Sequence, residues 1–421
     1  MFIVYDLIFV LAAFVYLPKY LFRRKFHAGL WQRLGFFPEG AKFNRPIWIH
    51  AVSVGEAMAI RSLLEGLKER YPQKQFVIST VTATGNKVVQ GMVQAKDRVI
   101  YLPLDLSFIV DSVIKRINPA LFIIVETEIW PNLIRCLYKR KIPVITVNGR
   151  ISNASFRGYS CIRPLFRPTL RKIGIFCVQS ETDLSRLKYL GVDAEKIKVT
   201  GNMKFDIKPP KESAGYRQSL RLNLEDRLLV AGSTHPKEEE IILNAYKGLL
   251  RQYPALRLLI APRHPERVDK VSELIKDFGF QPSRVSLLAK EKPLSGAIFI
   301  LDTVGELSSF YAIADIVFIG GSLVEKGGHN ILEPAYFAKP ILFGPHMFNF
   351  RDIADLFLRD HDVLLVRNAR ELESRIQALL ESDSLAKDLG HSAKEILIAN
   401  QGATLRNLGY ISKIVDSRLS L

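Results

Sequence analysis

The chain has 421 residues, of which 48% are hydrophobic and 24% are charged. These ordinary globular values exclude collagen, coiled coil and wholesale disorder, and at about 150 residues per domain the length predicts two or three domains. Lysine and arginine number 59 against 42 aspartates and glutamates, so the net charge is +17. Residues 1–205 hold 31 basic and 14 acidic residues, whereas residues 206–421 hold 28 of each. The first half therefore favours an anionic partner: nucleic acid, an acidic membrane or a phosphorylated substrate.

The chain opens on an apolar stretch. Residues 2–17 are apolar apart from Asp6, and four basic residues follow within residues 19–25. A cleavable signal peptide would carry its charge before the apolar run and a small-residue site after it. We expect instead an uncleaved N-terminal membrane anchor over residues 1–22, with the basic side in the cytoplasm. A buried or interfacial helix is the alternative.

Beyond this stretch, short β-rich runs alternate with helix-length segments. The expected strands are residues 46–52, 76–80, 98–102, 121–126, 143–148 and 174–179, then 228–231, 257–261, 297–301, 315–319, 340–343 and 363–366. This alternation predicts an α/β protein with doubly wound parallel sheets. The run KPPK at residues 208–211 cannot continue a helix or a central strand, so we place a linker there. The domains are then residues 23–207 and 208–421, around a cleft.

Carboxylates follow two strands of the first half, at the strand ends where parallel sheets bind ligands. Glu56 comes after the turn of HAVSVGE (residues 50–56), where it can accept a proton from a hydroxyl or favour a helix start. The spacing leaves both roles open. Glu126 and Glu128 leave the end of the apolar strand two residues apart, and a functional role is favoured for them.

A basic stretch begins after these glutamates. Residues 129–180 hold ten lysines and arginines and no acidic residue. The arginines that we single out there, interleaved with aromatic residues, are Arg150, Arg157, Arg163 and Arg167. Such a surface suits phosphates and a lipid surface, and it equally suits single-stranded nucleic acid. Next to the expected linker, Lys204 is either an anion contact or a solvated lysine.

In the second half, the residues after three strands suit an anion. Ser233 and Thr234 precede an open helix start, and Arg263 can make paired hydrogen bonds to a phosphate or a carboxylate. Residues 320–334 hold two glycine pairs. The residues of this segment that we expect at a nucleotide phosphate or ribose are Gly320, Gly321, Gly327, Gly328, Asn330 and Glu333. The glycines form a backbone cradle for a phosphate, and Glu333 lies one turn into the following helix, within reach of ribose hydroxyls.

Several common motifs are missing. The sequence contains no G-x-x-x-x-G-K-[ST] loop and no strand-borne G-x-G-x-x-G, which argues against NTPases and classical dehydrogenases. It also contains no H-E-x-x-H and no carboxylate pair bracketed by histidines. The sequence therefore predicts neither a metal site nor a bound cofactor.

Taken together, these segments resemble the 3-deoxy-D-manno-octulosonic acid (Kdo) transferases of lipopolysaccharide assembly. The matching strings are HAVSVGE (50–56), ETEIWPN (126–132), NGRIS (148–152), GNMKFD (201–206), GSTHPKEE (232–239), APRHPER (261–267), GGSLVEKGGHNILEPA (320–335) and FGPHMFNF (343–350). They are long, unusual and in the family's order over nearly the whole chain.

The resemblance implies a GT-B fold of two Rossmann-like domains around a cleft. It implies metal-independent transfer of Kdo from CMP-Kdo to a lipid A precursor, with inversion, at the cytoplasmic side of the inner membrane. Glu56 would be the general base, and one of Glu126 and Glu128 would be essential. Arg263, the glycine segment with Asn330 and Glu333, and Lys204 would hold the donor.

Two alternatives remain. Another GT-B enzyme, a transferase or epimerase that uses a UDP-sugar, would fit the same cleft motifs. A non-enzymatic protein that binds anionic lipid or nucleic acid would fit the basic stretch, but it leaves the glycine segment and the paired glutamates unexplained.

Overall fold

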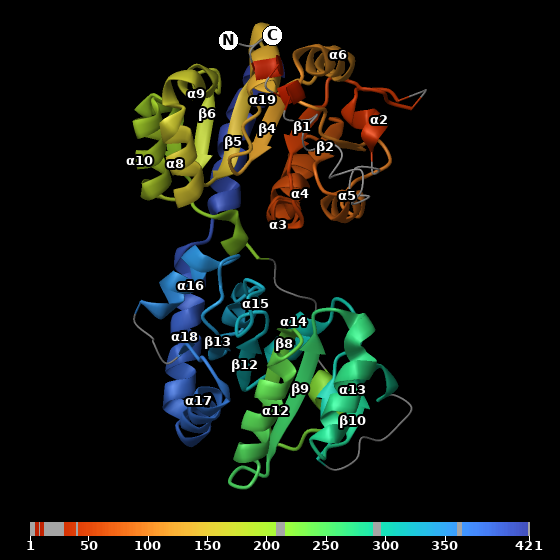
Figure 1. The fold of residues 1–421 in the computed structure, drawn as a ribbon, viewed down its shortest axis with the longest axis vertical. Coiled ribbons are helices and arrows are strands. Elements are labelled where there is room, and N and C mark those ends of the chain that lie inside the picture. Colours follow the sequence, from red (N-terminus) through yellow and green to blue (C-terminus); the bar gives the residue numbers. More distant parts are fainter. Residues whose placement is uncertain are drawn as a thin grey trace. The chain divides into compact units, whose positions relative to one another are not determined.

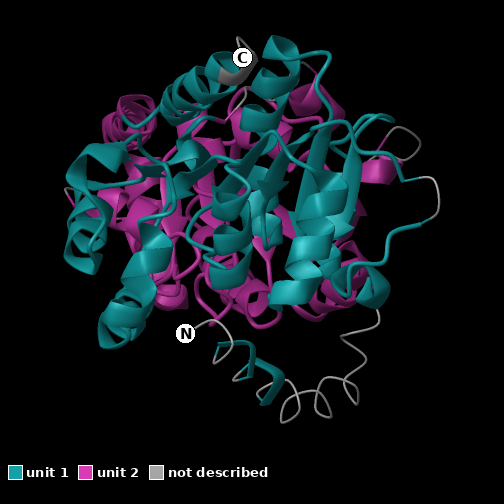
Figure 2. Ribbon diagram, turned by 90° about the horizontal axis from the view of Figure 1, so that it is seen from above, with its two compact units in different colours: residues 1–206, 400–421 teal, residues 207–399 magenta. Residues whose placement is uncertain are grey.

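The computed structural model describes residues 5–7, 9–11, 29–38, 41–207, 215–288, 296–359 and 364–419. The chain forms two compact units, coloured separately in Figure 2. Unit 1 comprises residues 1–206 and 400–421, and unit 2 comprises residues 207–399. The expected linker motif at residues 208–211 lies outside the described residues.

Unit 1 contains a seven-stranded parallel sheet in the order β3-β2-β1-β4-β5-β6-β7. Its strands are β1 (Ile47–His50), β2 (Phe76–Thr80), β3 (Arg98–Tyr101), β4 (Leu121–Val125), β5 (Val144–Gly149), β6 (Ile175–Val178) and β7 (Ile197–Val199). Figure 1 labels β2, β1, β4, β5 and β6 of this sheet. Strands β1, β2, β4 and β5 are buried along their whole length, which explains their unbroken apolar sequences.

Helices cover both faces of this sheet. They are α2 (Leu30–Arg33), α3 (Val54–Ala59), α4 (Arg61–Arg70), α5 (Ala83–Gln90), α6 (Ser107–Ile117), α7 (Pro131–Lys139), α8 (Asn153–Cys161), α9 (Arg163–Leu170), α10 (Glu181–Leu190) and α19 (Ala403–Leu419), with the 3-10 turns η1 (Ala194–Lys196) and η2 (Met203–Phe205). Helices α3, α4 and α19 pack on one face, and α6, α7 and α9 pack on the other. The segment between β1 and β2 forms two helices, α3 and α4, which meet at Ile60.

The last helix departs from the expected domain division, which placed residues 400–421 in the C-terminal domain. Its buried Ile411 and Val415 join the core of unit 1. At its start, the Asp206 carboxylate accepts the backbone N–H of Gly402 at 2.6 Å and of Thr404 at 2.5 Å. The helix therefore belongs to unit 1, because its apolar face and its N-terminal donors are both satisfied there.

Unit 2 contains a six-stranded parallel sheet in the order β10-β11-β9-β8-β12-β13. Its strands are β8 (Arg227–Thr234), β9 (Leu256–Pro262), β10 (Pro282–Arg284), β11 (Ile298–Ile300), β12 (Ile316–Ile319) and β13 (Ile341–Phe343). Its helices are α11 (Tyr216–Ser219), α12 (Glu238–Leu249), α13 (Val268–Asp277), α14 (Leu307–Ile313), α15 (Leu332–Tyr336), α16 (Arg351–Leu358), α17 (Ala369–Glu381) and α18 (Asp383–Ala399), with the 3-10 turns η3 (Pro265–Arg267) and η4 (Val285–Leu287). The expected strand at residues 363–366 is reduced to one bridge from Phe343 to Leu365, and Val363 lies outside the described residues.

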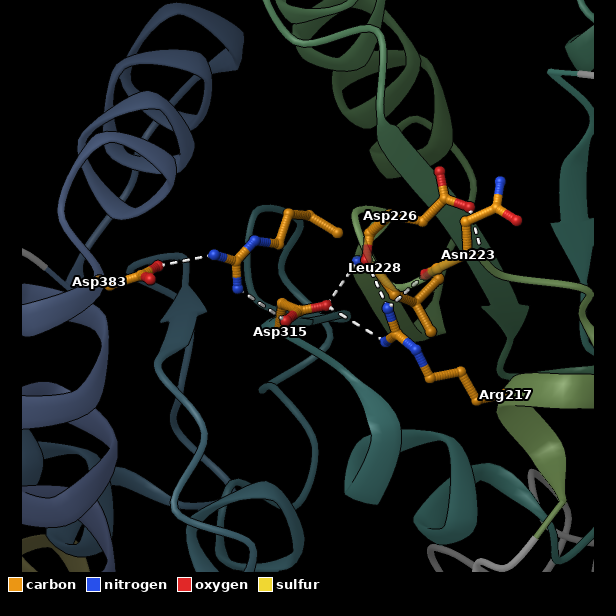
Figure 3. Close-up of polar contacts among 7 residues, drawn as sticks. Arg217, Asn223, Asp226, Leu228, Asp315 and Asp383 are labelled. Atoms are coloured by element: carbon orange, nitrogen blue, oxygen red, sulfur yellow. Dashed lines mark hydrogen bonds and ion pairs between the residues drawn. The ribbon is translucent and has the colours of Figure 1, made fainter.

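An ion-pair network ties the amino-terminal edge of this sheet to α11 and α18 (Figure 3). The Asp315 carboxylate lies 3.8 Å from Arg217 and 3.3 Å from Arg227, and it accepts the backbone N–H of Leu228 at 2.8 Å. Arg227 also pairs with Asp383 at 2.8 Å. The network lies at the opposite end of the strands from the expected donor residues.

The expected anchor at residues 1–22 lies mostly outside the described residues. Residues 5–7 and 9–11 are helical, and the Asp6 carboxylate accepts the Ser107 hydroxyl at 2.5 Å and the Asn132 side-chain amide at 2.6 Å. Among the helices that the structure describes, none combines the length and the apolar character needed to cross a bilayer.

Candidate functional site

Glu56 lies at the start of α3, just beyond the end of β1. Its backbone N–H donates to the Ser53 hydroxyl, and its carboxylate accepts the Val52 backbone N–H at 2.7 Å and the Ser53 hydroxyl at 3.0 Å. Only 7% of the residue is exposed. Burial raises the pKa of this carboxyl to about 7, and Glu126 and Glu128 add to the rise, against the two hydrogen bonds. A carboxyl with that pKa can exchange protons near neutrality.

Glu126 and Glu128 occupy the turn between β4 and α7. Because β4 is the parallel neighbour of β1, this turn emerges at the same edge of the sheet as Glu56. Glu126 has a φ of +58°, in the left-handed region that is uncommon for a residue other than glycine. Burial, followed by repulsion from Glu126, raises the pKa of the Glu128 carboxyl. The structure thus brings the three predicted glutamates into electrostatic contact.

Asp105 supports this turn, a role that the sequence did not reveal. Its buried carboxylate accepts the backbone N–H of Asn132 at 3.0 Å and of Leu133 at 2.8 Å, in the first turn of α7. The helix that follows the glutamates is therefore capped by a residue from before α6. No local sequence pattern could have revealed this cap, because Asp105 and Asn132 lie 27 residues apart in the chain.

Lys204 belongs to unit 1. It lies in η2, whose first residue, Met203, donates its backbone N–H to the Asn148 side chain at 2.9 Å. Asn148 is the predicted strand-end residue of the NGRIS motif and has a φ of +52°. The structure therefore places Lys204 in a different unit from the other predicted donor residues.

The predicted basic surface is formed by α8, α9 and the turn before them. Arg157 and Arg167 are exposed, and the Arg163 guanidinium lies 4.9 Å above the Tyr189 ring. Two large apolar side chains, Ile162 at 46% and Leu165 at 60%, are exposed among these arginines. The backbone oxygen of Arg150 accepts the Thr127 hydroxyl, which connects the surface to the glutamate turn. The surface is both cationic and apolar.

In unit 2, the glycine segment is held by a carboxylate. The fully buried Glu238, at the start of α12, accepts the backbone N–H of Gly321 at 2.6 Å, of Ser322 at 3.0 Å and of Leu323 at 2.9 Å. It also accepts the N–H of His235 at 2.9 Å. A string of backbone donors that the sequence assigns to a bound phosphate is thus partly used by Glu238.

Two glycines of the segment are dictated by close packing or conformation. A Cβ at Gly320 would lie 2.3 Å from the Ser233 carbonyl oxygen, because β12 and β8 come together there. Gly327 has a φ of +93°, and its Cβ would lie 2.3 Å from the Asn349 side chain. Gly321 and Gly328 also have positive φ values. The glycines are therefore required by the fold of the segment itself.

The remaining predicted donor residues divide by role. The Thr234 hydroxyl donates to Glu239 at 2.9 Å, and Glu239 pairs with Arg267 at 2.8 Å, so these side chains stabilise one another. The Asn330 side chain donates to Glu333 at 3.0 Å. Burial raises the pKa of Glu333, and this hydrogen bond opposes the rise. Ser233 has a φ of +58°, and Arg263 is exposed beyond the end of β9.

Three histidines gather at the same edge of the unit 2 sheet, and sequence reasoning did not single them out. The His235 and His329 rings are parallel within 4°, with their Nε2 atoms 2.9 Å apart. The His264 ring lies 5.8 Å from that of His235. In the part of the chain that the structure describes, no group of three or more His, Cys, Asp or Glu side chains is arranged to hold a metal ion.

Comparison with known proteins agrees with this arrangement. Residues 28–207 match the family model described as 3-deoxy-D-manno-octulosonic-acid transferase (kdotransferase), and residues 217–396 match that of glycosyl transferases group 1. The 3-deoxy-D-manno-octulosonic acid transferase of Haemophilus influenzae is 38% identical over 403 residues, 93% of this chain and 92% of that protein.

Solved structures with lower identity share the fold. A glycosyltransferase from Rickettsia africae is 15% identical with a TM-score of 0.55, covering 88% of this chain and 99% of its own. Anabaena HepE, solved in complex with UDP, is 16% identical with a TM-score of 0.56, covering 89% of this chain and 100% of its own. With the two parallel sheets, these similarities establish the predicted GT-B glycosyltransferase fold.

Proposed function

Because the chain belongs to the 3-deoxy-D-manno-octulosonic acid (Kdo) transferase family of glycosyltransferases, we propose that it transfers Kdo from CMP-Kdo to a lipid A precursor, with inversion at the anomeric carbon. The observation that carries the proposal is the position and the raised pKa of the Glu56 carboxyl. This buried carboxyl lies at a strand end beside two further glutamates, and its pKa is raised to about 7.

Glu56 has the properties of a general base. Each of its oxygens accepts one hydrogen bond, from Val52 or from Ser53, so each keeps a lone pair for an incoming hydroxyl. A base is most effective when its pKa lies near the working pH. We expect Glu56 to take the proton of the attacking lipid hydroxyl as the bond from Kdo to CMP breaks.

The donor is assigned to the carboxyl edge of the unit 2 sheet. CMP-Kdo carries one phosphate and one carboxylate, and Arg263 is an exposed guanidinium at this edge. Glu333, held by Asn330, is available to ribose hydroxyls. A single phosphate as leaving group needs less charge neutralisation than a diphosphate, so cationic side chains and backbone N–H groups suffice and no metal is required.

The acceptor is assigned to the basic surface of α8 and α9. Lipid A precursors carry phosphates on an acylated sugar, and this surface presents arginines beside exposed Ile162 and Leu165. That combination suits the cytoplasmic leaflet of a bacterial inner membrane better than it suits nucleic acid. A protein binds single-stranded nucleic acid through aromatic rings that stack on the bases and through cations that contact the phosphates.

The test is a direct assay with mass spectrometry of the lipid. Purified protein is incubated with a tetra-acylated lipid A precursor and CMP-Kdo generated in situ. A lipid heavier by one or more Kdo residues supports the proposal and counts the sugars. An unchanged lipid, while a known transferase is active in parallel, contradicts the donor or the acceptor, and competition by CMP against UDP then separates a CMP-sugar donor from a UDP-sugar donor.

Variants assign the base. Glu56→Gln should collapse turnover while CMP binding persists, and Glu126→Gln and Glu128→Gln should show which of the two is essential. The matched control is Glu69→Gln, an exposed glutamate on α4, which should leave turnover unchanged. Turnover near the wild-type rate in Glu56→Gln would remove Glu56 from the base role.

A further inference from the structure

We propose that His235 and His329 form a proton-accepting pair that takes up one proton from solvent when an anionic nucleotide ester binds at the carboxyl edge of the unit 2 sheet. This inference rests on the proposed function, because it assumes that the donor phosphate binds there. It adds a linkage between proton binding and donor binding, carried by two histidines to which the sequence analysis assigned no role.

The pair is built by the fold and not by local sequence. His235 follows β8 and His329 lies 94 residues further along, in the glycine segment after β12, the parallel neighbour of β8. A Cβ at Gly321 would lie 3.1 Å from the His329 ring and 3.4 Å from the His235 ring, so both rings pack on the backbone of the segment. Gly321 is itself fixed by the Glu238 carboxylate at 2.6 Å.

The 2.9 Å separation of the two Nε2 atoms defines the chemistry of the pair. A hydrogen bond between two ring nitrogens needs one N–H donor and one lone pair, so one proton lies between the rings. In the neutral pair, the ring that donates has a lone pair at Nδ1, and the ring that accepts carries its proton there. The neutral pair thus presents one donor and one acceptor away from the shared bond.

Adding one proton at the free Nδ1 leaves the shared hydrogen bond intact. Both Nδ1 atoms then carry N–H donors, and the pair gains a positive charge. An anion prefers two donors and a charge over one donor and one lone pair. A bound phosphate ester therefore favours the protonated pair, and the proton is taken from solvent.

The charges around the pair hold it neutral in the free protein. They lie on the loop after β9, on η3, on the glycine segment and on α12: Arg263, His264, Arg267, Lys326 and Glu238. The Glu238 carboxylate is used by backbone N–H groups, Arg267 pairs with Glu239, and Glu266 lies 3.6 Å from His264. Burial is the largest cause that lowers the pKa of each ring to about 4. Arg263 adds to the lowering for both rings, and Lys326 and Arg267 add to it for His235. An incoming anion offsets that repulsion.

The probe must not titrate itself. The methyl ester of CMP keeps one negative charge between pH 5.5 and 8, unlike CMP, whose second phosphate proton would confuse the count. Isothermal titration calorimetry of the full chain, in buffers of different ionisation enthalpy, gives the number of protons taken up. If binding of the ester takes up a proton, the affinity for the ester must fall as the pH rises. The fall reaches tenfold per pH unit where one full proton is taken up for each ester bound.

Variants locate the proton. His235→Gln and His329→Gln keep a polar group of similar size but cannot titrate, so each should abolish the uptake and flatten the pH dependence of affinity. The matched control is His391→Gln, an exposed residue on α18 whose ring Nδ1–H donates to the Lys387 carbonyl oxygen, and it should leave the uptake unchanged. The wild-type measurement stands without any variant.

The outcomes separate the two proposals. Ester binding without proton uptake, or uptake that persists in both glutamine variants, overturns the proton-accepting pair and leaves the donor assignment standing. Uptake with the methyl ester of UMP but no binding of the CMP ester supports the pair and overturns the cytidine donor. Failure of both esters to bind overturns both.

Discussion

Replacing Glu56 by glutamine should stabilise unit 1 at alkaline pH while it removes turnover. The residue is 7% exposed, and burial raises the pKa of its carboxyl from 4.5 to about 7. The folded state therefore holds this proton more tightly than the unfolded chain. For a carboxyl shifted in this direction, stability falls as pH rises from 4.5 to about 7 and is level above that. Glutamine does not titrate, so the variant escapes this loss.

The magnitude follows from the same shift. Between pH 5 and pH 8 the stability of the variant relative to wild type should rise by about 2 to 3 kcal/mol. The two oxygens of the carboxylate accept one hydrogen bond each, from Val52 and from Ser53. The glutamine amide has a single oxygen, so it can keep only one of these two hydrogen bonds. This loss of about 1 kcal/mol applies at every pH, so it lowers the whole curve without changing the difference.

The chain offers a convenient probe of unit 1 for this measurement. Its three tryptophans, Trp31, Trp48 and Trp130, all lie in residues 1–206, so their fluorescence during urea unfolding reports that unit. Wild type, Glu56→Gln and the exposed control Glu69→Gln are compared at pH 5 and pH 8. A stability difference between Glu56→Gln and wild type that does not change with pH would refute the buried, high-pKa carboxyl, and with it the main support for the base.

Three further predictions concern unit 2. Glu238→Gln should leave some of its four backbone donors unsatisfied and destabilise the unit by about 1 to 3 kcal/mol, seen as faster amide exchange at residues 321–323. Gly320→Ala should prevent stable folding of unit 2, because its Cβ would lie 2.3 Å from a backbone oxygen. The control is Gly409→Ala on α19, where a Cβ would meet open space. In a thermal unfolding assay this control should be neutral or slightly stabilising. Asp315→Asn keeps an acceptor for Leu228 but loses two partly exposed ion pairs, so it should cost about 1 kcal/mol at low salt and less at 1 M salt.

The strands that the sequence predicted well are those buried on both faces. Residues 76–80 form β2 within the expected bounds, and the apolar run at residues 121–125 is β4. Two strands were missed, β7 at Ile197–Val199 and β10 at Pro282–Arg284. Both are three-residue edge strands in which only Ile197 is buried, so neither carries the unbroken apolar run of a central strand.

The placement of candidate site residues was predictable where a polar residue directly follows a strand end. Glu56, Glu126 and Glu128 lie together as such residues, and their catalytic roles stay predictions. Glu238 was not predicted, because three consecutive glutamates at a helix start look like a response to the helix dipole. Three of its four backbone donors lie 83 to 85 residues away, and so no local rule could separate it from its neighbours. The packing of α19 on unit 1 could not be predicted either, because the partners of this helix are far away in the sequence.

The two sheet edges are suited to opposite chemistry, and their internal bonding explains why. In unit 1, Glu56 and Glu128 keep raised pKa values, so this edge can receive protons but repels a phosphate. In unit 2, the carboxylates of Glu238 and Glu239 are used up by backbone N–H groups and by Arg267. The exposed guanidinium of Arg263 remains at that edge and can attract an anion. Under the proposed function, the phosphate groups of the acceptor are held away from the glutamates, by the arginines of α8 and α9. The net charge of the first half then serves to hold the acceptor, and the neutral second half binds the donor through a few local cations.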